Sequence, residues 1–108
     1  MKSLRLYRTK NGKEPFTEWM DCLKDHVVVA QINNRVRRLS LGQRGDYKRV
    51  SNGVFELRIH YGSGYRVYFA EHGQEIVILL LGGDKKAQKR HIEQAILYWK
   101  DYKERHNG

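Results

Sequence analysis

Alternation between apolar and polar residues in the second half of the chain limits the fold more than any other sequence feature. Three segments there have the composition and period of β-strands: residues 54–60, 65–70 and 75–81. The first alternates strictly, so Phe55, Leu57 and Ile59 share one face of the predicted strand. Turn signals at residues 61–64 and 72–73 separate the three segments. The pattern predicts an antiparallel meander whose last, largely apolar strand lies centrally in the sheet.

Helical patterns flank these strands. Pro15 suits the first turn of a helix, because its missing N–H would have no partner there. The apolar stripes that follow have the spacing of two short helices: Phe16, Trp19, Met20 and Leu23 in the first, and Val29, Ile32, Val36 and Leu39 in the second. We expect these two helices to form a hairpin. Further on, Gly82-Gly83 is predicted to end the third strand, Asp84 to cap a helix, and a stripe from Ile92 to Tyr102 to run along that helix.

These elements predict a single α+β domain over residues 1–108. With a strand at residues 3–8 and a short one at residues 47–51, the order is β-α-α-β-β-β-β-α. The expected fold is a small antiparallel sheet packed against the N-terminal helical hairpin, with a C-terminal helix. The expected core residues of the sheet are Phe55, Leu57, Ile59, Val67, Phe69, Ile78 and Leu80. They should pack against residues of the hairpin, namely Phe16, Trp19, Leu23, Ile32 and Val36.

Positive charge is the most informative bulk property of the chain. There are 21 Lys and Arg against 12 Asp and Glu, which gives a net charge of +9 at pH 7. Residues 31–60 hold seven basic and two acidic side chains. Such a field favours a polyanion or an acidic protein as the partner, without deciding between them.

Other features make several classes of protein and site improbable. The single cysteine, Cys22, cannot form an intramolecular disulfide, and the histidine spacing fits no metal motif, so we expect no metal and no cofactor. The longest purely aliphatic run, residues 76–81, falls short of the roughly 20 residues that span a membrane. The N-terminal residues carry charges where a signal peptide needs an apolar stretch. The expected protein is soluble and cytoplasmic, without a membrane partner.

The strand pattern also places chemistry-bearing side chains on one face of the sheet. Glu56, Arg58 and His60 share the face opposite the apolar one, and the neighbouring strand adds Arg66. A basic cluster, residues 85–90, follows the last strand. Arginine forks bind phosphate oxygens and a carboxylate or imidazole can move protons, so this face suits a phosphodiester. The alternative is that these side chains are only the solvated side of a two-faced sheet.

Three segments resemble the RelE/ParE toxin superfamily, and most closely its HigB-like "addiction module killer protein" branch. They are Gly53-Val54-Phe55-Glu56-Leu57-Arg58-Ile59, Gly64-Tyr65-Arg66-Val67-Tyr68-Phe69 and Leu79-Leu80-Leu81-Gly82-Gly83-Asp84-Lys85-Lys86-Ala87-Gln88. The resemblance covers nearly the whole chain. It implies a small antiparallel sheet with two N-terminal helices on one face. In many such toxins a lysine stands where this chain has Glu56, and a tyrosine stands near His91 or Ile92.

The resemblance implies a toxin of a type II toxin–antitoxin system that acts as an mRNA endonuclease and inhibits translation. The ribose 2′-hydroxyl would attack the adjacent phosphate without a metal ion, Arg58 and Arg66 would hold that phosphate, and Glu56 or His91 would transfer the proton. The predicted catalytic set is Glu56, Arg58, Arg66, Lys86 and His91. The predicted RNA-binding set is Arg35, Arg38, Lys48, Arg49, Lys85 and Lys89. Two other hypotheses remain open, a non-enzymatic toxin that poisons gyrase in the manner of ParE and a plain nucleic-acid-binding module.

The same resemblance implies the partners. A cognate antitoxin, often with a helix-turn-helix domain, would cover the basic surface. The substrate would be mRNA, in many relatives on the ribosome. Operator DNA would be contacted only through the antitoxin.

Overall fold

The computed structural model describes residues 1–106, which form five strands and three helices. The strands are β1 (Ser3–Leu6), β2 (Tyr47–Ser51), β3 (Val54–Ile59), β4 (Tyr65–His72) and β5 (Ile76–Asp84). The helices are α1 (Pro15–Cys22), α2 (His26–Ser40) and α3 (Gln88–His106), and a 3₁₀ turn, η1 (Lys85–Ala87), leads into α3. The predicted α+β class and the predicted order of elements are confirmed. Within the described residues no helix is long and apolar enough to cross a bilayer.

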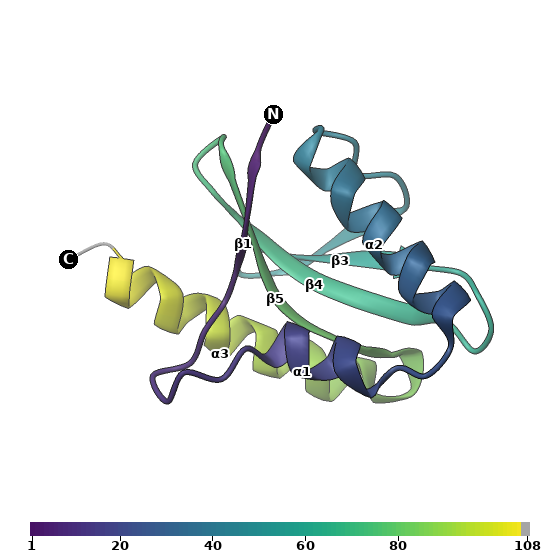
Figure 1. The fold of residues 1–108 in the computed structure, drawn as a ribbon. Coiled ribbons are helices and arrows are strands. Elements are labelled where there is room, and N and C mark those ends of the chain that lie inside the picture. The colour runs from purple at the N-terminus through teal and green to yellow at the C-terminus, as the bar shows by residue number, and fades with distance from the viewer. Residues whose placement is uncertain (107–108) are drawn as a thin grey trace.

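The sheet has the strand order β1-β5-β4-β3-β2 (Figure 1). Strands β2 to β5 form the predicted antiparallel meander, with β5 and β4 inside the sheet. The first strand adds a feature that alternation alone does not specify, because β1 pairs with β5 in parallel, Ser3 opposite Ile76. The sheet is therefore mixed rather than wholly antiparallel.

Helices cover both faces of the sheet, and each face has its own core. On one face α1 and α2 bury Phe16, Val28 and Ile32 against Leu57 and residues of β4 and β5. Figure 1 shows α2 crossing this face. On the other face α3 packs its own apolar stripe, formed by Ala95, Trp99 and Tyr102, against the sheet. We call these the hairpin core and the α3 core.

The predicted core residues are all buried or partly buried, but two of them belong to the other face. Ile78 and Leu80 lie in the α3 core and not against the hairpin, because β5 alternates and sends Val77 and Leu79 toward α1 and α2. The register between β4 and β5 also skips Leu80, a β-bulge. A strand that is apolar on both faces gives no sign of which face belongs to which helix.

The buried stripe of α2 begins one residue earlier than the sequence pattern suggests. Val28 is buried and Val29 only half-buried, and the stripe continues through Ile32, Val36 and Leu39. The Asp25 side chain accepts a hydrogen bond from the backbone N–H of Val27 at 2.9 Å and so caps the start of this helix.

The glycine pair at the end of β5 does not end the strand, so that prediction is wrong. Strand β5 runs through Gly82 and Gly83 to Asp84. Both glycines are needed for space. A Cβ on Gly82 would overlap the ring of Trp19 on α1, and a Cβ on Gly83 would overlap the ring of His91 on α3. Helices on both faces thus approach the same two residues of backbone.

Leu57 tests the hairpin core. Its side chain is fully buried under α2, and Leu57→Ala is expected to lower the free energy of unfolding by about 2–5 kcal/mol. Urea unfolding followed by circular dichroism measures this change. Leu97→Ala, at an exposed position of α3, is the matched control and should change it by less than about 0.5 kcal/mol. Equal effects of the two substitutions would contradict the described core.

Candidate functional site

The strand register brings the predicted arginines together on the α3 side of the sheet. Arg58 on β3 lies directly opposite Arg66 on β4, and Arg66 lies opposite Gly83 on β5. Glu56 and Tyr68 form the neighbouring row of the same face. The face that the alternation marks as polar is therefore not a solvated surface, because α3 covers it.

Glu56 is the centre of this group and has no exposed surface. Its carboxylate accepts hydrogen bonds from the hydroxyl of Tyr68 at 3.1 Å, from Nε2 of Gln88 at 2.6 Å and from Nε of Arg58 at 3.2 Å. Nε of Arg66 lies 3.5 Å from the same carboxylate, within ion-pair distance. We call these five residues the Glu56 cluster. A buried carboxylate with these partners is held rigidly and orients the groups around it.

The two arginines would repel each other across the strands without Glu56, because like charges directly opposite are destabilising. Their side chains keep some contact with solvent, 30% for Arg58 and 13% for Arg66. Nε of Arg66 is buried and has no hydrogen-bond partner among the described residues. The pair therefore has a fixed position, and the partly exposed guanidinium groups can offer N–H donors to a ligand, the arrangement that binds an oxyanion.

Tyr68 donates its hydroxyl hydrogen to Glu56. Burial, and then the neighbouring carboxylate, raise the pKa of Tyr68. The hydroxyl therefore stays protonated at neutral pH and remains a donor. This fixes Tyr68 as a support for Glu56 rather than a group that exchanges protons.

His91 lies beside the cluster, on the first turn of α3. Its ring packs on Gly83 and has its centroid 6.5 Å from that of Tyr68. Burial, followed by the nearby positive charge of Arg90, lowers the pKa of His91, so the ring is neutral at neutral pH. Its Nδ1 is buried without a hydrogen-bond partner in the described part of the chain. A neutral imidazole can accept a proton, and because Nδ1 is buried against Gly83, that role falls to the other ring nitrogen, Nε2.

The packing of His91 on Gly83 can be tested directly. Gly83→Ala is expected to displace the imidazole and to lower the free energy of unfolding by about 1–3 kcal/mol, because the added methyl occupies the space of the ring. The NMR signals of the His91 ring should shift. Ser63→Ala, in the exposed turn before β4, is the control and should leave them in place. Unmoved His91 signals in the Gly83 variant would refute this packing.

The basic cluster after β5 is exposed around the 3₁₀ turn. Asp84 caps the turn, as predicted, and its carboxylate accepts from the backbone N–H of Lys86 at 3.0 Å and of Ala87 at 3.4 Å. Those two N–H groups are thus already partnered. A bound phosphate would therefore meet the side chains of Lys85 and Lys86 rather than the free end of a helix.

The other predicted RNA-binding residues do not form one surface. Lys48 lies opposite Glu56 in the strand register and so is on the face of the cluster. Arg49 lies opposite Phe55 on the other face, with its guanidinium 5.5 Å from the centroid of that ring. Arg38 is exposed on α2, across the sheet from the cluster.

Arg35 makes structural contacts instead. Its guanidinium donates to the carbonyl oxygen of Arg58 at 2.7 Å and to that of Asp46 at 3.0 Å. These bonds fix the segment before β2 against β3. His60 is exposed and pairs with the Asp46 side chain, away from the buried carboxylate.

Sequence reasoning did not select two members of the cluster, Tyr68 and Gln88. Alternation places Tyr68 on the same face as Arg66, and this is the signal that could have selected it. Gln88 had no signal at all, since its contact with Glu56 depends on where α3 docks.

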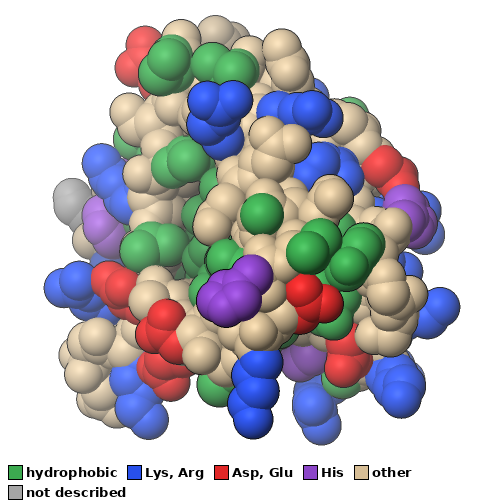
Figure 2. All heavy atoms as spheres, turned by 45° about the vertical axis from the view of Figure 1, so that its right-hand side comes forward, with side chains coloured by type: hydrophobic (Ala, Val, Ile, Leu, Met, Phe, Trp, Pro, Cys, Tyr) green, Lys and Arg blue, Asp and Glu red, His purple; other side chains and the backbone are tan. Residues whose placement is uncertain are grey.

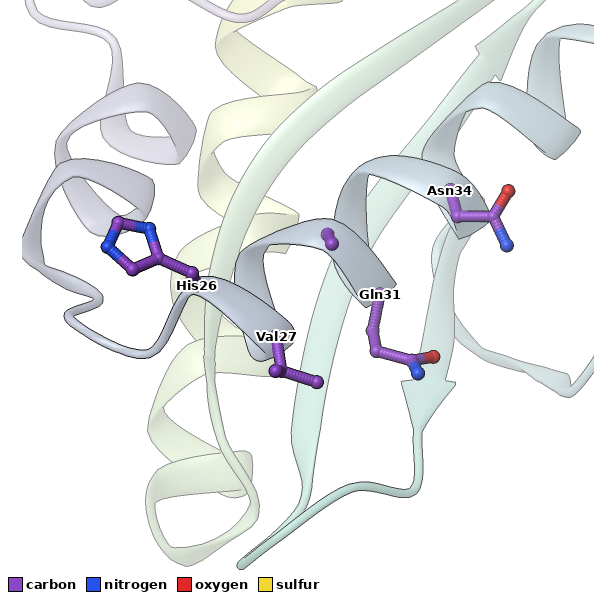
Figure 3. Close-up of a pocket in the computed structure, with 5 residues that line it drawn as sticks. His26, Val27, Gln31 and Asn34 are labelled. Carbon is purple, nitrogen blue, oxygen red and sulfur yellow. The ribbon is translucent and has the colours of Figure 1, made fainter.

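On the face that Figure 2 shows, charged side chains are spread rather than concentrated. In Figure 2 Lys and Arg side chains surround the face in view, with Asp and Glu side chains among them. A hollow on the outer side of α2, lined by His26, Val27, Ala30, Gln31 and Asn34, holds no Lys or Arg (Figure 3). Among residues 1–106 no three His, Cys, Asp or Glu side chains are placed to hold a metal ion. The Glu56 cluster therefore remains the strongest candidate site.

One family model matches most of the chain. The family model described as "Phage derived protein Gp49-like (DUF891)" matches residues 18–97, a range that includes all of the Glu56 cluster and His91. A Haemophilus influenzae protein named "Uncharacterized protein" is 49% identical to this chain over 82 residues, which cover 76% of the chain and 83% of that protein.

Proposed function

The chain belongs to the Gp49-like family of phage-derived proteins, and on that premise we propose that it is the toxin of a type II toxin–antitoxin pair and that it cleaves mRNA. Two features support the proposal. The three segments that resemble the RelE/ParE superfamily lie on β3, β4 and β5, which carry the candidate site. The single observation that carries it furthest is the pair Arg58 and Arg66, held by a buried carboxylate on the face of the sheet where the neutral ring of His91 packs.

In the proposed reaction the ribose 2′-hydroxyl of one nucleotide attacks the phosphorus of the next. The new O–P bond forms as the bond to the 5′-oxygen breaks, giving a 2′,3′-cyclic phosphate and a 5′-hydroxyl end. Arg58 and Arg66 bind the non-bridging oxygens and stabilise the charge that grows on them. His91, neutral at neutral pH, accepts the proton of the 2′-hydroxyl.

The remaining charged residues have supporting roles in this proposal. Lys86, exposed near the start of α3, donates a proton to the leaving 5′-oxygen, which becomes the hydroxyl of the product, and Lys85 and Lys48 bind flanking phosphates. Glu56 has no exposed surface and so acts as a positioning residue for the two arginines rather than as a proton acceptor. An antitoxin with an acidic segment is the proposed partner, because the basic surface attracts a chain of opposite charge.

Induced expression of the chain, with and without the neighbouring gene, tests the function. We expect growth arrest without the neighbour, relief with it, and new mRNA fragments whose 5′ ends are hydroxyls. Ligation-based mapping of 5′-hydroxyl ends measures the cleavage. Arrested cells with intact mRNA and broken DNA would overturn the nuclease proposal in favour of gyrase poisoning.

A further inference from the structure

Two adjacent hollows lie along the N-terminal half of α3, next to the Glu56 cluster. The basic hollow is lined by Lys86, Ala87, Lys89, Arg90 and Glu93. The apolar hollow is lined by Ser51, Gln88, Lys89, Ile92, Glu93 and Ile96. Lys89 and Glu93 line both hollows, so the two hollows adjoin along this ridge of the helix, one charged and one apolar, and we call the two together the groove.

Helical spacing explains the change of character. Gln88, Ile92 and Ile96 recur every four residues and form the side of α3 that faces Ser51, at the end of β2. Ile92 and Ile96 also pack against the α3 core, so the floor of the apolar hollow is fixed by the fold. The basic hollow lies on the other side of the ridge, where three of its five side chains are cationic.

The groove is connected to the proposed catalytic site. Gln88 lines the apolar hollow and also donates to the Glu56 carboxylate, which in turn holds Arg58. A group bound in the apolar hollow is thus one side chain away from the cluster that positions the arginines. The hollow on the outer side of α2 has no such connection and no Lys or Arg in its lining.

A groove with a basic half and an apolar half is complementary to a nucleotide, because a nucleotide joins an anionic phosphate to a flat, weakly polar base. We propose that the groove binds the nucleotide beside the scissile phosphate, with its base in the apolar hollow and its own phosphate against Lys89 and Arg90. This inference rests on the proposed function, because it takes RNA as the ligand. It adds a subsite and a source of base preference.

Glu93 determines which base that subsite should prefer. Its carboxylate only accepts hydrogen bonds, and it lies on the ridge between the two hollows. A base that presents an exocyclic amino group, such as cytosine, satisfies this acceptor, whereas uracil has the carbonyl oxygen O4 in place of that amino group. The groove should therefore favour cytosine over uracil.

Titration of the full-length chain with cytidine 3′-monophosphate and with uridine 3′-monophosphate tests the subsite. The expected result is saturable movement of the methyl NMR signals of Ile92 and Ile96, with cytidine 3′-monophosphate bound about 10-fold more tightly. Glu93→Gln should abolish that difference while the isoleucine signals still respond. Glu104→Gln, at an exposed position further along α3, is the matched control and should preserve it.

The outcomes separate this inference from the proposed function. Unmoved Ile92 and Ile96 signals, or a cytosine preference unchanged by Glu93→Gln, would overturn the subsite even if the wild-type chain cleaves mRNA. Saturable binding in the groove by a chain that produces no 5′-hydroxyl ends would uphold the subsite and reject the nuclease function.

Discussion

Replacing Arg66 with alanine is expected to lower the rate of RNA cleavage about 10²–10³-fold and to abolish growth arrest. Arg66 stands opposite Arg58 in the register, beside the carboxylate that fixes both, and its buried Nε has no hydrogen-bond partner among the described residues. The substitution leaves the three hydrogen bonds of Glu56 in place but removes one of its ion-pair partners, so the melting temperature should fall, though by less than in a Glu56→Ala variant. Quantified 5′-hydroxyl ends, paired with a melting curve, measure the two effects separately.

Arg66→Lys should restore only part of the activity, because lysine keeps the charge but loses the planar fork. The matched control is Arg37→Ala, which removes an exposed arginine of α2 on the other side of the sheet. It should retain full toxicity. A folded Arg66→Ala variant with undiminished toxicity would remove Arg66 from the site, and the nuclease proposal would then depend on Arg58 and the lysines alone.

Glu56→Ala is expected to produce the largest loss of stability in the site, about 3–5 kcal/mol, because removing one partner of a buried ion pair leaves the other charge uncompensated. Tyr68 and Gln88 lose their acceptor in the same step. Glu56→Gln keeps the size of the side chain and one acceptor oxygen, so its cost should be smaller, about 1–3 kcal/mol. Urea unfolding of the two variants measures the difference.

The glutamine variant also distinguishes the two roles considered for Glu56. A positioning residue replaced by its amide should leave measurable cleavage, with an unchanged pH dependence. A proton acceptor replaced by its amide should leave cleavage no higher than in the His91→Gln variant. The second result would exchange the roles that we propose for Glu56 and His91.

The pairing of the two arginines could be predicted from the sequence because it depends on local rules. A strict period of two fixes which side chains share a face, and a short turn fixes which strands are neighbours. The same rules place Tyr68 beside Arg66. They require no knowledge of what lies above the sheet.

The burial of Glu56 could not be predicted in this way. A polar side chain on an alternating strand has the same pattern whether water or a helix covers it, and only the docking of α3 decides. The prediction that the glycine pair ends β5 was wrong for a related reason. In the sequence Gly82 and Gly83 suggest a turn. In the fold they lie within β5, and because they have no side chains they leave room for the rings of Trp19 and His91. Packing between segments that are distant in the chain produces no periodic pattern in the sequence.

The parallel pairing of β1 with β5 has a consequence for the order in which the chain acquires its site. A ribosome makes β1 at the start, but its partner on the sheet is not synthesised until residues 76–84, and Gln88 and His91 come later still. Contacts between residues so distant in sequence form late and slowly. The nascent chain therefore carries its arginines for much of its own translation without the helix that completes their surroundings. Any activity that requires the assembled cluster begins only after α3 has been synthesised and has docked on the sheet.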